Sequence, residues 1–445
     1  MTARVPRGVV ALSLIAVVVV TAQLLRLTVY VVDPADARWS VIPWNVFAAN
    51  HSCLSGYWAA ARTVETAPNV WDDSLSSTAG PTPSSPRVPK RIGRFIMDGY
   101  EYTPTFLLLP RALVHVAPDF PGFRRLWFVL SLAVVLAAVA AVSARLAPAI
   151  GPSMIWLSPL ILAPLSVLVT FQMGNIQLAC IAGALLGMLC FDRAAGSRHP
   201  TLLYATGGLL LAFMTVSKLY PGMLVLYLLL RRDWHAFGWT SAWAAGLLLA
   251  GLADMGMAVH QAFLDHLPGL LSGESFPPLR NPRGISANMS VPGLTLKLGL
   301  FGVPGLSFGA MRVVGWIYTV VLIGIVVRLA RRPTARPVEP IVWIVILLLA
   351  TLRSPVLPVY GIFPQVWLLV IVLAARWAEP GVRFALLAMF VLLFGLGPNQ
   401  MLWPPQVHAV FSTVVQTAGS LALAVMALRL APVSGDPPAA SAAGR

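Results

Sequence analysis

The stretch Arg94-Phe-Ile-Met-Asp-Gly-Tyr-Glu-Tyr-Thr-Pro-Thr-Phe-Leu-Leu-Leu-Pro-Arg111 combines the two features that decide how this chain folds. Its first half carries Asp98, Glu101 and two tyrosines, and its second half is an apolar run between two prolines. The polar segment 33–93 precedes it, and long apolar runs follow it as far as residue 429. Acid–base side chains therefore stand at the entrance to a hydrocarbon environment, which suggests chemistry on a substrate carried by a lipid.

The composition indicates a membrane protein. Of the 445 residues, 58% are hydrophobic and 11% are charged, whereas soluble domains carry about 25% charged residues. Apolar runs of about 17–22 residues recur along the chain, and they lack the alternation that strands of a membrane barrel show. Because only helices and closed barrels satisfy backbone polar groups in lipid, the sequence predicts an all-α integral membrane protein.

We expect a bundle of about twelve (roughly 10–13) transmembrane helices. The expected spans lie near residues 8–32, 126–147, 153–170, 175–191, 201–216, 219–230, 236–258, 308–327, 340–352, 358–375, 384–397 and 407–429. The predicted domains are a first helix at 1–32, an extracytoplasmic loop with an interfacial or re-entrant segment at 33–117, a multi-helix bundle at 118–430 with a second outer loop at 259–307, and a disordered cytoplasmic tail at 431–445.

The net charge of +15 is concentrated in short loops between apolar runs. An N-terminus inside the cell places these loops in the cytoplasm, as the positive-inside rule requires; they contain Arg193, Arg198, Arg231, Arg232, Arg328, Arg331, Arg332, Arg336, Arg376, Arg383 and Arg429. In this topology residues 104–117 dip into the membrane without crossing it, and Arg124 and Arg125 remain outside as exceptions. In the alternative topology, 104–117 cross the membrane and one later segment is re-entrant. We therefore predict a multi-pass protein of the bacterial inner membrane, in contact with membrane lipids and with no nucleic-acid partner.

Four side chains of the first outer loop are candidates for a general base, which the transfer of a sugar to a hydroxyl requires: His51, Asp98, Glu101 and Asp33. A near-neutral pKa suits a histidine to this role. Asp98 and Glu101 lie at the membrane edge, and Asp33 follows the first helix directly. The alternative for each is an ordinary role as a solvated, capping or hydrogen-bonded side chain.

Cations that could hold a departing phosphate are the second group of candidates: Lys218, Arg280, Arg283 and Arg353. Lys218 is one of three lysines and lies between two apolar runs, where an ionisable group is costly; extension of its side chain to the membrane surface is the alternative. The three cysteines have no zinc-site spacing, and we predict no required cofactor or metal, although Asp33 and Asp36 leave a divalent metal open.

Several short motifs follow one another along the chain: Glu101-Tyr-Thr-Pro-Thr-Phe-Leu-Leu-Leu-Pro110, Gly174-Asn-Ile-Gln177, Lys218-Leu-Tyr-Pro221 followed by Leu-Leu-Leu-Arg-Arg-Asp-Trp234, Asn288-Met-Ser-Val-Pro-Gly293 and Arg353-Ser-Pro355. In this order they resemble glycosyltransferase family 87, membrane enzymes of the GT-C superfamily. The resemblance covers roughly residues 50–400, and the Lys218 motif is its most specific part. It implies a GT-C-type bundle, and it makes Tyr102, Asn175, Tyr220 and Asn288 candidates for substrate binding.

The resemblance also implies an activity. Such an enzyme moves a sugar, typically mannose, from a polyprenyl-phosphate donor to a hydroxyl of a lipid or glycan acceptor at the extracytoplasmic face. Because a lipid phosphate departs directly, we expect inversion at the sugar carbon. A transporter or lipid flippase is the rival class, but its ionisable groups would lie mid-membrane in two related halves, whereas here the polar residues concentrate on one face.

One departure from the family concerns the base. The family places an aspartate shortly before an aromatic pair and a small-residue helix, which Tyr57-Trp58-Ala-Ala-Ala-Arg62 resembles. The position of that aspartate falls near Cys53, and residues 50–56 contain no carboxylate. Either His51 is the base, or an acid from elsewhere (Asp33, Asp98 or Glu101) occupies the site, or the protein is changed in activity or inactive.

Overall fold

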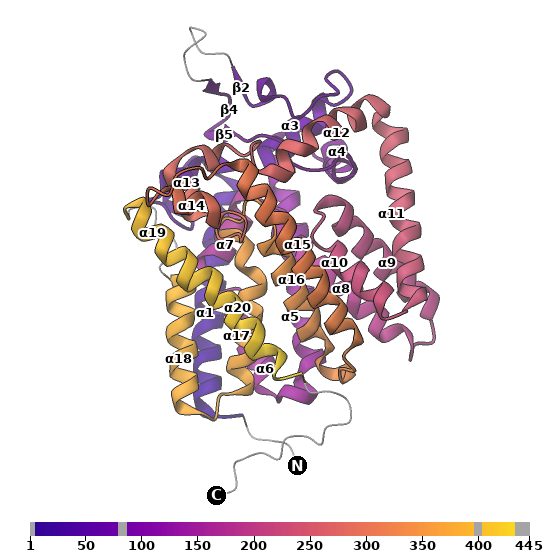
Figure 1. The fold of residues 1–445 in the computed structure, drawn as a ribbon, viewed down its shortest axis with the longest axis vertical. Helices are drawn as coiled ribbons and strands as arrows, with labels where there is room; N and C mark the ends of the chain where they lie inside the picture. Colours follow the sequence, from indigo (N-terminus) through magenta and orange to yellow (C-terminus); the bar gives the residue numbers. More distant parts are fainter. Residues whose placement is uncertain (1–4, 79–86, 396–402, 432–445) are drawn as a thin grey trace, which may run out of the picture.

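The computed structural model describes residues 5–78, 87–395 and 403–431 and is predominantly helical (Figure 1). Within these residues, seven helices are long and apolar enough to cross a bilayer: α1 (Arg7–Val32), α5 (Phe120–Ile150), α8 (Gln177–Ala194), α9 (Pro200–Ser217), α11 (Trp234–Met255), α15 (Phe308–Arg331) and the stretch Pro405–Leu428 that includes α19 (Pro405–Phe411) and α20 (Gly419–Leu428). A pair bent by 53°, Ser153–Ile161 with Leu165–Met173, adds an eighth if it is one span; it contains α6 (Ser153–Leu157) and α7 (Leu165–Met173). The predicted helical membrane architecture is therefore confirmed.

The other expected spans are shorter helices: α10 (Gly222–Leu230), α16 (Glu339–Leu352), α17 (Phe363–Ala375) and α18 (Pro380–Phe390), the last continued by π-helical residues Val391–Gly395. At about 1.5 Å per residue, none of the four reaches the roughly 30 Å of a hydrocarbon core by itself. The count of about twelve spans thus stays a prediction. The end of the expected span at 384–397 and the tail after residue 431 lie outside the described residues.

The helices form a buried centre and a rim. In α16 every residue from Pro340 to Leu352 is buried, and in α17 every residue from Phe363 to Ala374 is buried. A helix that is apolar and buried on all sides belongs in the core of a bundle. By contrast, α1 and α15 expose large apolar side chains such as Val18 and Val320. Exposing such apolar surfaces to water costs free energy, so these helices are suited to face lipid.

A small cap covers the end of the bundle opposite the start of α1 (Figure 1). Its central sheet has the order β1 (His51–Ser52), β5 (Phe95–Met97), β4 (Arg91–Ile92), with β1 parallel and β4 antiparallel to β5. A second antiparallel pair joins β2 (Ser77–Thr78) to β3 (Val88–Pro89). Three short helices complete this part: α2 (Val46–Asn50), α3 (Leu54–Thr63) and α4 (Leu108–Val116).

Buried polar side chains join the bundle helices to one another and to the cap. Arg124, only 2% exposed, donates to the carbonyls of Tyr30 at 2.8 Å and Val31 at 3.1 Å, which are among the last, otherwise unpaired carbonyls of α1. Gln172, near the end of α7, accepts from the Val41 amide at 2.7 Å and donates to the Ala48 carbonyl at 2.8 Å. Arg124 therefore has a structural role, which accounts for its place as an exception to the charge rule.

The second outer region follows α11 and contains α12 (Met257–Ser272), α13 (Pro282–Ala287) and α14 (Leu294–Gly299). Arg111 of α4 joins the first outer loop to the end of α11, because its guanidinium lies 2.6 Å from Asp254 of α11 and 2.8 Å from Glu65. Glu101 of the first outer loop reaches the second region, because its Oε2 atom lies 3.0 Å from Nε2 of His266 in α12. The two expected outer loops are therefore in contact. The boundaries of the four predicted domains remain predictions.

Candidate active site

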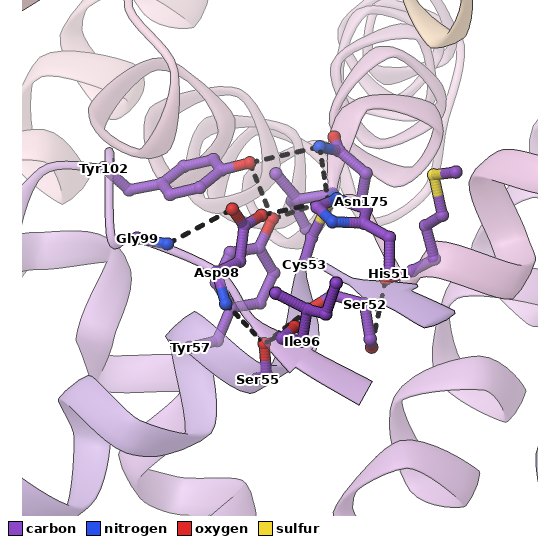
Figure 2. Close-up of polar contacts among 12 residues, drawn as sticks. His51, Ser52, Cys53, Ser55, Tyr57, Ile96, Asp98, Gly99, Tyr102 and Asn175 are labelled. Carbon is purple, nitrogen blue, oxygen red and sulfur yellow. Dashed lines mark hydrogen bonds and ion pairs between the residues drawn. The ribbon is translucent and has the colours of Figure 1, made fainter. Parts of the chain in front are cut away.

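The side chains of His51, Cys53 and Asp98 converge beside the central sheet (Figure 2). The Nε2 atom of His51 lies 3.6 Å from the Cys53 Sγ atom and 3.5 Å from Asp98 Oδ2. One ligand-type atom from each residue lies within 4.8 Å of the other two. Asp98 is the most accessible of the three, with a side chain 37% exposed against 15% for His51, whereas Cys53 is buried.

Strand pairing and a glycine bring Asp98 to this position. Asp98 follows β5, whose last residue, Met97, pairs with Ser52 directly before Cys53. The Asp98 amide donates to Ser55 Oγ at 2.8 Å. A Cβ atom on Gly56 of α3 would lie 2.9 Å from the Gly99 carbonyl oxygen, so the close approach of the two segments requires glycine there.

Two tyrosines and an asparagine form the wall behind these groups. The Tyr57 hydroxyl donates to the Tyr102 hydroxyl at 2.6 Å. The Asn175 amide nitrogen lies 3.4 Å from both Cys53 Sγ and the Tyr102 hydroxyl. Burial raises the pKa of both phenols, so they remain neutral hydrogen-bonding groups. Gly174 precedes Asn175 with φ +71° and faces Leu54, a conformation that favours glycine.

Lys218 lies on the other side of Tyr102. Its ammonium nitrogen is 5.0 Å from the centre of the Tyr102 ring, a cation–π contact. The Thr103 hydroxyl donates to the Val216 carbonyl and holds this end of α9 against the cap. In the described part of the chain no carboxylate lies within ion-pair distance of Lys218. Tyr220, two residues on, interacts electrostatically with Tyr102 and Cys180.

The other predicted acids have polar partners outside this cluster. Glu101 pairs with His266 of α12, with 3.0 Å between Oε2 and Nε2. Burial raises the pKa of the Glu101 carboxyl, and the hydrogen bond from His266 opposes that increase, although the charge of Asp98 in the cluster also raises this pKa. His266 also lines a surface pocket of about 270 Å³ with Asn69, Trp71, Ala262 and Asp265. Asp33 is exposed, and its carboxylate accepts from the Ala35 amide at 3.0 Å.

The predicted arginines and Asn288 make contacts of their own. Arg280 is exposed and donates to the Glu274 carbonyl at 2.8 Å, Arg283 is exposed, and Arg353 donates to Thr319 Oγ1 at 2.9 Å. Asn288 is buried; its amide oxygen accepts from the Leu357 amide at 2.8 Å, and its nitrogen donates to the Pro355 carbonyl at 2.8 Å. None of these contacts reaches the His51 cluster, so a role for these residues in substrate binding stays a prediction.

Sequence reasoning did not single out Ser55, Tyr57 or Tyr360 as site residues. Tyr360 interacts electrostatically with Cys53 and Asp98 from the segment between α16 and α17. A serine or tyrosine in an apolar stretch gives no signal of its own. Only their position around Cys53 and Asp98, near the place where the resemblance put an acid, identifies these residues.

One nitrogen, one sulfur and one carboxylate oxygen form a donor set of a kind that zinc accepts. Zinc binds the thiolate form of cysteine, however, and burial raises the pKa of the Cys53 thiol, which disfavours that form. The chemistry available without a metal is that of a carboxylate with a neighbouring imidazole, opposite an unpaired ammonium group. The expectation that no cofactor is required therefore stays a prediction.

Residues 100–355, more than half of the 445-residue chain, match the family model described as glycosyltransferase family 87. The match includes Tyr102, Asn175 and Lys218, and it begins two residues after Asp98. No curated protein and no solved structure matches the chain.

Proposed function

The chain belongs to glycosyltransferase family 87, and on this basis we propose that it is a membrane enzyme that transfers a sugar from a polyprenyl-phosphate donor to an acceptor hydroxyl outside the cytoplasm. The sugar is mannose, and the acceptor is a lipid or a glycan of the cell envelope. The protein resides in the bacterial inner membrane, with residues 33–117 on the outer side and no nucleic-acid partner. The seven long apolar helices found among the described residues support the membrane location.

One observation carries the proposal: a partly exposed carboxylate and an unpaired ammonium group flank the same tyrosine-lined wall. Asp98 lies within 4.8 Å of Cys53, the position where the family pattern places its aspartate. Lys218 lies beyond Tyr102. Asp98 thus supplies a carboxylate where residues 50–56 have none, which favours an active enzyme over an inactive relative.

In the proposed reaction, Asp98 accepts the proton of the acceptor hydroxyl while the acceptor oxygen attacks the anomeric carbon. The bond between that carbon and the phosphate oxygen breaks on the opposite side, so the configuration inverts. The polyprenyl phosphate leaves with the bonding electrons, and the Lys218 ammonium balances its growing negative charge. His51 holds the Asp98 carboxylate in place, and Tyr102 and Asn175 position the sugar.

The donor class can be tested with membrane vesicles that contain the protein, an acceptor lipid extract and radiolabelled mannose in two forms. We expect transfer from polyprenyl-phosphate mannose and none from nucleotide-linked mannose in vesicles depleted of polyprenyl phosphate. Vesicles prepared without the protein give the background. Direct transfer from the nucleotide sugar would overturn the proposed donor, and lack of transfer from any polyprenyl-phosphate hexose would overturn the proposed reaction.

A further inference from the structure

A basic pocket lies at the far end of the molecule from the cap. It has a volume of about 530 Å³ and lies where the C-terminal ends of α10 and α15 meet the segment 332–336. Ten of the described residues line it, and five of these are arginines: Arg231, Arg232, Arg331, Arg332 and Arg336. Its volume falls within the roughly 300–1,000 Å³ typical of small-molecule sites.

The protein neutralises little of this charge. Arg231 lies 3.6 Å from the Glu339 carboxylate, which also accepts from the Tyr227 hydroxyl at 2.8 Å. Arg332 donates to the Ala431 carbonyl at 2.7 Å. In the described part of the chain the side chains of Arg232, Arg331 and Arg336 make no hydrogen bond or ion pair. Three guanidinium groups therefore remain available to a ligand.

The backbone at Arg232 is unusual. Among the described residues, Arg232 is the one residue other than glycine with a positive φ, at 59°. It follows α10 at a helix end where this conformation ordinarily favours glycine. An arginine is thus held in a conformation that disfavours any side chain, and such strain is found more often at binding and active sites than elsewhere.

Membrane orientation alone does not account for this arrangement. The positive-inside rule requires basic residues in cytoplasmic loops, but it does not require them to converge on one concave surface. Arg328 and Arg198 satisfy the rule as exposed residues outside the pocket. The arginines of the pocket, by contrast, come from two different loops and face one common space.

We propose that this pocket binds a phosphate-bearing anion at the cytoplasmic membrane surface. The planar guanidinium fork matches phosphate oxygens in a bidentate way. Basic pockets between membrane helices on this side of the bilayer are suited to anionic headgroups. The phosphate can come from the phosphodiester headgroup of a lipid or from a soluble phosphate compound. The site lies at the opposite end from the proposed reaction centre and does not depend on the proposed function.

The test uses the purified full-length protein in a neutral detergent, with two probes: short-chain phosphatidylglycerol and inorganic pyrophosphate. Binding is measured by native mass spectrometry and by the shift in melting temperature. The test variant is Arg331→Gln/Arg336→Gln, and the control is Arg198→Gln/Arg328→Gln, which removes the same charge from outside the pocket. We expect the test variant to bind about tenfold or more weakly, while the control binds like the unmodified protein.

The probes separate the two sources of phosphate. Saturable binding of phosphatidylglycerol alone identifies a lipid headgroup site, and binding of pyrophosphate as well identifies a general phosphate site. If the test variant unfolds in detergent, Arg331→Lys/Arg336→Lys replaces it, and weakened binding is again expected because lysine lacks the bidentate fork. Equal affinities in the unmodified protein and both double variants, or no saturable binding of either probe, would overturn the proposal.

Discussion

Replacing Asp98 by asparagine is expected to lower kcat for sugar transfer by about 10²–10⁴-fold, the contribution typical of a positioned general base. At neutral pH an asparagine side chain cannot take the proton from the hydroxyl group of the acceptor substrate. It does retain an oxygen in place of Oδ1, which accepts from the Gly99 amide at 3.1 Å, and the backbone bond to Ser55 is unaffected. The fold and the binding of the donor should therefore survive. The measurement is steady-state transfer as a function of donor concentration.

The matched control for this variant is Asp73→Asn, which removes an exposed carboxylate from the same outer loop. We expect the control to transfer sugar at the rate of the unmodified enzyme. A second comparison uses His51→Ala: if His51 only holds the carboxylate, its loss should cost less than the loss of Asp98. A rate in Asp98→Asn within about twofold of the unmodified enzyme, well below the expected 10²–10⁴-fold loss, would remove Asp98 from the mechanism.

Replacing Lys218 by methionine is expected to lower kcat/KM for the polyprenyl-phosphate donor by about 10²–10³-fold. The ammonium group is the cation next to Tyr102, and its loss leaves the departing phosphate without a balancing charge. Because Lys218 has no carboxylate partner in the described part of the chain, its removal leaves no buried anion unpaired. The melting temperature in detergent should therefore stay unchanged or rise.

Lys90→Met is the control for the charge, because Lys90 is exposed on the cap and donates to the Ser74 carbonyl. It should leave kcat/KM unchanged. Lys218→Arg should recover part of the lost activity, since it restores the positive charge with a different shape. A fall in melting temperature of Lys218→Met that accounts for the loss of activity would show that Lys218 is structural instead.

Membrane helices were predictable because their signal is local. Apolar runs such as 8–32 correspond closely to α1 (Arg7–Val32), and Lys218 was identified because a lysine between two apolar runs is costly wherever the chain goes. Whether the shorter apolar segments cross the bilayer could not be predicted in the same way. The nine residues of α10, for example, are as apolar as nine residues of a longer, spanning helix would be. Hydropathy reports burial in apolar surroundings and does not report whether a helix crosses the bilayer.

The composition of the site was only partly predictable. His51 and Asp98 were both candidates, but a pairing of two or three residues between β1 and β5 brings them together, and strands that short show no periodicity in sequence. The pairing of Glu101 with His266 joins two loops that are distant along the chain, so it also left no local signal. Family motifs placed the missing acid near Cys53, and the structure shows which carboxylate lies there.

The proposed enzyme requires its cap to face outward, where a lipid-linked sugar and its acceptor meet. Single cysteines at exposed Ser74 in the cap and at Gly196 between α8 and α9 report the two faces, in a background that carries Cys190→Ala; Cys53 and Cys180 are buried. In intact cells a membrane-impermeant maleimide should label Ser74→Cys but not Gly196→Cys. Gly196→Cys should be labelled only after the membrane has been opened. Labelling of Gly196→Cys in intact cells, with Ser74→Cys protected until the membrane is opened, would place the His51, Cys53 and Asp98 cluster inside the cell and contradict the account.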